Sequence, residues 1–244
     1  MKPFRISTSI NWARESYQRN ILAFIALAAI VTILQFGQQL ATDPISESFN
    51  LCLNAGGLAS NGSSLDAQAM ENCVAEQLPT LVLSMLVVLV FVLASFLATA
   101  GVIRGALHVS MGANIGFADT FLGKYFIQFL FTIVIIMIAF TAGLFLLVVP
   151  AFIALLLFQF APFFALDRGY GPFLALKSSV GIVRKNWSLS ILVLLVSGVA
   201  YLISGLFWGI PTIVALPIAA LVTTYAYQKL TGNPVTNDPA ERLE

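Results

Sequence analysis

The sequence predicts an all-α, polytopic membrane protein with six transmembrane helices, because charges are scarce and apolar residues gather in long runs. Of its 244 residues, 59% are hydrophobic and 9% are charged, whereas soluble domains carry about 25% charged residues. Runs of about twenty apolar residues match a hydrocarbon core of about 30 Å at a rise of about 1.5 Å per residue. Six runs contain no Asp, Glu, Lys or Arg: residues 20–40, 80–103, 125–149, 151–166, 187–210 and 212–228.

The later runs pair into helical hairpins. The fourth and sixth runs are short, and each begins directly after a proline, Pro150 or Pro211, that closes a long run. Proline lacks a backbone N–H and clashes with the preceding turn, so we expect tight turns there, near the outer interface. The first run is longer than the apolar core of a signal peptide, and no small-x-small cleavage site follows Leu40. We therefore expect a retained helix rather than a cleaved signal peptide.

The basic residues predict the orientation. With the N-terminus inside, all 12 Lys and Arg residues fall on the cytoplasmic side, as the positive-inside rule requires. Residues 1–19 then form a cytoplasmic interfacial helix, 20–229 one six-helix membrane domain and 230–244 a cytoplasmic tail. The net charge of +1 gives no basic field for nucleic acid. An external loop, 41–79, carries five acidic residues: Asp43, Glu47, Asp66, Glu71 and Glu76.

Both cysteines, Cys52 and Cys73, lie in this external loop. An oxidising compartment permits a disulfide there, and closing such a loop stabilises a fold by about 3 kcal/mol in the chain-entropy model. We therefore predict a Cys52–Cys73 bond, with two unpaired thiols as the alternative. A metal site would need further ligands, and the single histidine, His108, lies on the other side of the membrane. We expect no metal and no cofactor.

The chain resembles itself when it is shifted by 61 residues. The shift places Lys124 on Lys185 and Pro150 on Pro211 without a gap, and a weaker third copy begins near Pro79. We interpret the membrane domain as three repeated hairpins, about residues 5–111, 112–168 and 172–229, each preceded by an interfacial amphipathic helix. Chance similarity between apolar runs is the alternative.

The clearest interfacial segment is 172–186, with weaker versions at 7–19 and 114–123. Phe173, Leu176 and Val180 fall on one helical face, which we expect to be buried. A charge introduced at Ser179 is expected to disturb folding or membrane packing less than a charge on that face, if Ser179 points outward. Other faces carry the basic residues predicted to contact anionic lipid headgroups: Lys177, Arg184 and Lys185.

The sequence shows no enzyme active site. It contains no Walker loop, no His-Glu-x-x-His and no Gly-x-Ser-x-Gly. The spans hold none of the ionisable residues that ion-coupled transporters keep at membrane depth. Gln35, Gln128 and Gln159 are interpreted as links between helices. Aromatic residues near the span ends are interpreted as interfacial anchors: Trp12, Tyr17, Tyr125, Tyr170, Trp187, Trp208, Tyr225 and Tyr227.

The segment from Phe164 to Trp187, FALDRGYGPFLALKSSVGIVRKNW, resembles poorly characterised bacterial multi-span proteins. These include actinobacterial proline- and glycine-rich transmembrane proteins and the membrane domain attached to some glycerophosphoryl diester phosphodiesterases. The similarity covers mainly residues 112–230. The resemblance implies a bacterial plasma membrane. A Pro/Gly-rich extension and a phosphodiesterase domain are both absent from this sequence, so the resemblance implies no catalytic residue.

Two classes of function follow. We expect a non-catalytic accessory, assembly or scaffold protein of a plasma-membrane complex, in the respiratory or envelope machinery, because the spans are uncharged and the external loop could dock a membrane-protein partner. The alternative is a carrier or passage for lipids or other apolar molecules, which the repeat and the basic interfacial helices favour.

Overall fold

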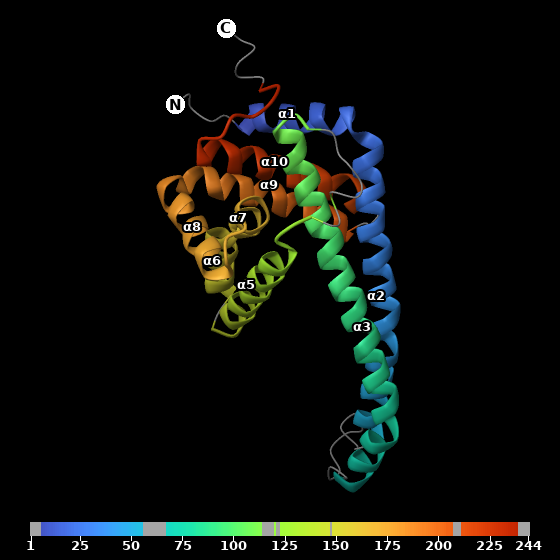
Figure 1. The fold of residues 1–244 in the computed structure, drawn as a ribbon. Coiled ribbons are helices and arrows are strands. Elements are labelled where there is room, and N and C mark those ends of the chain that lie inside the picture. Colours follow the sequence, from blue (N-terminus) through green and yellow to red (C-terminus); the bar gives the residue numbers. More distant parts are fainter. Residues whose placement is uncertain are drawn as a thin grey trace. The chain divides into compact units, whose positions relative to one another are not determined.

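A computed structural model describes residues 6–55, 67–113, 120, 123–146, 148–206 and 211–238. These segments form helices with short connections and contain no strand (Figure 1), which confirms the all-α prediction. The helices are α1 (Ile6–Arg19), α2 (Ile21–Ala55), α3 (Ala67–Ser110), α5 (Phe126–Leu146), α6 (Val148–Phe158), α7 (Ala161–Arg168), α8 (Pro172–Lys185), α9 (Trp187–Leu206) and α10 (Thr212–Thr231).

Several helices are long and apolar enough to cross a membrane. In the described part of the chain there are five such stretches, and six if the bent pair α8 and α9 counts as one span. The chain bends by 110° between α8 and α9. By length and composition the chain is therefore a multi-pass membrane protein. The five stretches are Ile21–Asn54, Gln68–Ser110, Phe126–Leu146, Val148–Arg168 and Thr212–Thr231.

Contacts divide the chain into two compact units. We call Ile33–Phe96 the hairpin unit, and Met1–Thr32 together with Leu97–Glu244 the bundle unit. In the hairpin unit, α2 and α3 run antiparallel. A Cβ atom added to Gly37 of α2 would lie 2.5 Å from the ring of Phe91 on α3, so glycine is what allows this large side chain to approach the α2 backbone.

The helices continue into the segment that was predicted as an external loop. α2 extends to Ala55 and α3 begins at Ala67, whereas residues 56–66 lie outside the described residues. Both helices pass through a proline, Pro44 in α2 and Pro79 in α3. A proline removes one helical hydrogen bond but does not have to end the helix. The expected loop 41–79 is thus helical over 41–55 and 67–79.

In the bundle unit, α5 packs on α6, and α10 packs on both α9 and α1 (Figure 1). α5 and α6 approach closely at Gly143. A Cβ atom added to Gly143 would lie 2.6 Å from the backbone nitrogen of Ala151. The turn expected at Pro150 falls earlier, since α6 begins at Val148. Pro150 lies in the first helical turn, where backbone N–H groups have no helical partner in any case. The fourth predicted span, 151–166, is the pair α6 and α7, interrupted at residues 159–160.

The core of the bundle unit is aromatic. Trp12 is 1% exposed, and its ring centroid lies 5.4 Å from that of Tyr225. Tyr17 stacks on Phe24 at 6.1 Å, and burial raises the pKa of the Tyr17 phenol. The interpretation as interfacial anchors is therefore wrong for Trp12, Tyr225 and Tyr227, because their rings fill the protein interior.

The threefold repeat stays a prediction. Short helices do precede two of the expected hairpins, α1 before α2 and α8 before α9. Most of the third expected interfacial segment, 114–123, lies outside the described residues. The expected ends of the membrane domain lie close to helix ends, since α1 ends at Arg19 and α10 at Thr231.

Candidate functional site

The tip of the hairpin unit is the strongest candidate site. The 35 residues of α2 and the 44 residues of α3 correspond to lengths of about 52 and 66 Å, well beyond a hydrocarbon core of about 30 Å. Carboxylates begin at Asp43 in α2 and end at Glu76 in α3. From these lengths and charges we expect residues 43–55 and 67–79, which we call the hairpin tip, to extend out of the hydrocarbon.

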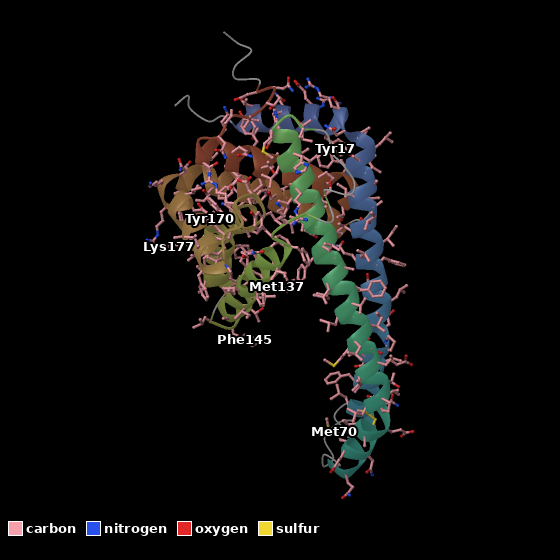
Figure 2. All side chains as sticks on the ribbon, in the orientation of Figure 1. Tyr17, Met70, Met137, Phe145, Tyr170 and Lys177 are labelled. Carbon is pink, nitrogen blue, oxygen red and sulfur yellow. A yellow bond between two sulfur atoms is a disulfide. The ribbon has the colours of Figure 1, made fainter. Side chains whose placement is uncertain are left out.

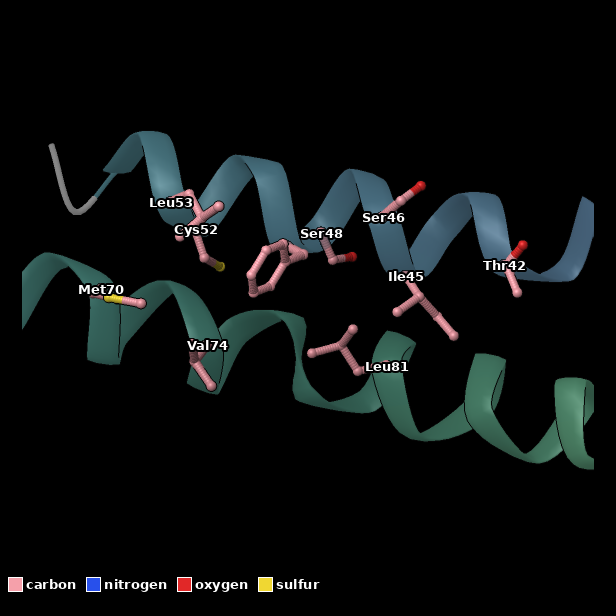
Figure 3. A pocket seen from close by; sticks show the side chains of 10 residues that line it. Thr42, Ile45, Ser46, Ser48, Cys52, Leu53, Met70, Val74 and Leu81 are labelled. Atoms are coloured by element: carbon pink, nitrogen blue, oxygen red, sulfur yellow. The ribbon is translucent and has the colours of Figure 1, made fainter. Parts of the chain in front are cut away.

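An apolar groove of about 410 Å³ lies between the two helices at the tip (Figure 3). Phe49 and Val74 border the groove and are 60% and 41% exposed. Large apolar side chains that stay exposed next to one another outside the hydrocarbon mark a binding surface. The apolar lining comes from both helices: Ile45, Phe49 and Leu53 of α2, and Met70, Val74 and Leu81 of α3.

The surroundings of the groove are acidic. Asp43 and Glu47 on α2, and Glu71 and Glu76 on α3, have exposed side chains. Residues 33–96 contain no Lys, Arg or His, so no basic group of this unit neutralises them. The groove therefore lies in a negative potential, which attracts basic partners and repels acidic ones.

Two links between the helices hold the tip together. The predicted Cys52–Cys73 disulfide is present, with Cα atoms 5.4 Å apart. One helical turn further on, the hydroxyl of Ser48, which is 4% exposed, donates to Oε1 of Gln77 at 3.2 Å. The groove walls are thus fixed before any partner arrives, which reduces the entropy lost on binding.

Sequence reasoning missed the groove although its signal is present. Thr42, Ile45, Phe49 and Cys52 recur at spacings of three and four residues, the period of one helical face. The acidic residues between them, together with Pro44, made the segment resemble a loop. Testing the loop for helical periodicity would have found the α2 wall.

The residues predicted to contact lipid lie on the exposed face of α8. Lys177, Arg184 and Lys185 all have exposed side chains, and Lys177 points away from the bundle unit (Figure 2). Phe173 and Leu174 are 78% and 52% exposed, and α8 contains no carboxylate. Exposed apolar side chains together with cations are typical of helices at a bilayer surface.

The buried face of α8 differs from the predicted one. Phe173 is exposed, whereas Ser179 is 0% exposed. The Ser179 hydroxyl donates to the carbonyl of Leu157 at 2.7 Å and accepts from the N–H of Phe160 at 3.2 Å. The expectation that Ser179 points outward is wrong, because α8 packs a stripe through Ala175, Ser179 and Val183 against its neighbours. Leu176 is 8% exposed, as expected, and burial of Phe173 in lipid stays a prediction.

A polar cluster, which the sequence did not predict, joins α1 to the segment after α10. The indole N–H of Trp12 donates to the Thr236 carbonyl at 2.9 Å. The Tyr225 hydroxyl donates to Oδ1 of Asp238 at 2.9 Å, and Lys229 forms an ion pair with the same carboxylate, whose side chain is 0% exposed. These contacts hold the segment after α10 against α1 and α10. Among the described residues, no group of three or more His, Cys, Asp or Glu could hold a metal ion.

Comparison with known proteins gives a partial likeness. Uncharacterised proteins from two strains of Mycobacterium tuberculosis and from Mycobacterium bovis are 33% identical to the chain over 137 residues. The match covers 56% of this chain and 42% of each relative, so the chain spans less than half the length of these curated relatives. It agrees with the predicted likeness to actinobacterial proteins, whereas the likeness to a phosphodiesterase membrane domain stays a prediction.

No family model and no solved structure matches the chain.

Proposed function

We propose that the chain is a non-catalytic, multi-pass accessory protein of a bacterial plasma membrane, with both termini in the cytoplasm, that docks a membrane-protein partner in the hairpin groove. The observation that carries the proposal is the apolar groove itself, open at the tip of a hairpin that is too long for the hydrocarbon core. A surface of this kind loses apolar contact with water when a partner covers it.

The chemistry around the groove selects the partner segment. A basic amphipathic helix places its apolar face between α2 and α3 and its Lys or Arg side chains near Glu47 and Glu71, in the helix-in-groove mode. Exposed ion pairs are each worth about 0–1 kcal/mol. The apolar groove therefore supplies most of the affinity, whereas the carboxylates supply the rate of association and the discrimination against acidic partners.

The exposed face of α8 supports a membrane role on the cytoplasmic side. Each cation near an anionic bilayer surface contributes about 1 kcal/mol, so Lys177, Arg184 and Lys185 would together favour anionic lipid. Because all 12 basic residues lie outside residues 33–96, the same charge distribution supports a hairpin tip on the external side.

A peptide titration tests the docking site directly. A fluorescent Lys/Leu amphipathic helical peptide is titrated onto the full chain in nanodiscs of a neutral phospholipid. Phe49→Asp is expected to weaken binding at least tenfold, because it places a charge in the apolar groove. Leu51→Asp is the matched control, since Leu51 is 50% exposed on the same helix but does not line the groove.

Charge reversal tests the selection of basic partners. In the Glu47→Lys/Glu71→Lys variant, preference should move from the Lys/Leu peptide toward a Glu/Leu peptide of the same length. In cells, a photo-crosslinking amino acid at position 49 should capture one partner in stoichiometric yield, and position 51 should not. Equal binding by the Phe49 and Leu51 variants, together with no change of preference on charge reversal, would refute docking in this groove.

A further inference from the structure

The bundle unit contains an apolar cavity of about 250 Å³ that is separate from the hairpin groove. Its wall includes side chains from every helix of this unit except α1, α2 and α8. One from each helix is Ile103 of α3, Ile136 of α5, Leu155 of α6, Phe163 of α7, Leu194 of α9 and Leu216 of α10. None of the residues that line it is charged.

Three polar side chains of the wall, Gln159, Ser197 and Thr223, form hydrogen bonds within the protein. Nε2 of Gln159 donates to the carbonyl of Ser190 at 3.0 Å. The Thr223 hydroxyl donates to the carbonyl of Ala219 at 2.8 Å, which leaves its oxygen as the acceptor for the Ser197 hydroxyl at 3.4 Å. Because a buried water needs two to four polar partners, such a wall holds water poorly.

The size of the cavity suits an apolar occupant. Protein interiors contain few voids larger than a water molecule, and an apolar cavity of about 150 Å³ already binds benzene or xenon. The cavity is smaller than the 300–1,000 Å³ typical of sites that enclose a drug-sized ligand. It therefore fits part of a long apolar molecule rather than a whole compact one.

The surroundings identify that molecule. The lining helices α3, α5, α6 with α7, and α10 belong to stretches apolar enough to cross a membrane, so the medium around them is lipid. We propose that the cavity binds one hydrocarbon chain of a membrane lipid, inserted between the helices. The inference rests on the wall of the cavity alone and is independent of docking at the hairpin tip.

Photolabelling in nanodiscs tests the proposal. Full-length chain is reconstituted with a trace of phosphatidylethanolamine that carries a diazirine near the end of one acyl chain, and labelled peptides are mapped by mass spectrometry. The expected result is labelling of the cavity wall near Leu155 and Leu194 that saturates with probe and is displaced by unlabelled lipid. A parallel experiment with a diazirine fatty acid shows whether the chain comes from a phospholipid or from a free acid.

Two variants change the cavity in opposite directions. Ala219→Phe fills it and should reduce wall labelling at least tenfold, whereas Ile133→Ala enlarges it and should raise labelling at least twofold. Val199→Phe is the control, because Val199 is 53% exposed on α9 and does not line the cavity. If Ala219→Phe fails to fold, Ile133→Ala alone decides. Wall labelling that does not saturate, or that stays constant in the variants that fold, would overturn the proposal.

Discussion

Removing the Cys52–Cys73 bond is expected to loosen the hairpin tip while leaving the bundle unit intact. The bond joins cysteines separated by 21 residues in sequence. In the chain-entropy model, a loop of this length lowers the entropy of the open chain by about 11 cal/mol/K, which stabilises the closed form by about 3 kcal/mol at 25 °C. Helical segments as short as the two arms of the tip are only marginally stable in water on their own. The loss should therefore be local.

Hydrogen exchange followed by mass spectrometry measures this effect. The Cys52→Ala/Cys73→Ala variant and the reduced wild-type chain are compared with the oxidised chain in nanodiscs. Because about 1.4 kcal/mol corresponds to a factor of ten, backbone amides in residues 43–55 and 67–79 should exchange about a hundredfold faster, with α10 unchanged as the internal reference. Exchange at the tip that stays within about twofold of the oxidised chain would show that the disulfide does not hold the groove walls.

Three further changes test contacts inside the bundle unit, each by thermal unfolding in detergent micelles. Ser179→Ala should lower the free energy of unfolding by about 1–3 kcal/mol because a buried N–H loses its acceptor, and Ser178→Ala should change it little; equal effects would contradict the geometry. Asp238→Ala should lower the free energy of unfolding by a similar amount, and Asp238→Asn, which keeps an acceptor, should recover part of it; no recovery would argue against the Tyr225 hydrogen bond. Gly143→Val should destabilise by about 1–3 kcal/mol through overpacking, whereas Gly198→Ala, with open space around the added Cβ, should not; matching melting temperatures would refute the close contact of α5 and α6.

The class of the fold could be predicted from composition because membrane crossing leaves a signal that needs no tertiary information. The first and last residues of the helices could not be predicted in this way. A charge-free run marks the part of a helix inside the hydrocarbon, whereas the helix itself ends only where its hydrogen bonding ends. α2 therefore continues past residue 40, and α3 begins before residue 80. The charge-free runs underestimate the length of both helices.

The polar cluster around Asp238 lay beyond sequence reasoning for a different reason. Its hydrogen bond between Trp12 and Thr236 joins residues 224 positions apart. Nothing local distinguishes Trp12, which is buried here, from a tryptophan that anchors a helix at the interface, because both positions lie near the end of an apolar span. Only the tertiary arrangement of α1 and α10 decides between them.

α8 shows why the periodicity of a membrane protein is ambiguous. In a soluble protein the apolar face of a helix points to the core, but here lipid and protein interior are both apolar, so Phe173 can face outward while Ser179 faces the protein. Ser179 lies beside the break between α6 and α7 at residues 159–160, just before Pro162 at the start of α7. Helix breaks inside a membrane are tolerated where side chains such as serine bind the freed backbone groups. Ser179 does so at Leu157 and Phe160, so the break between α6 and α7 accounts for the buried serine in α8.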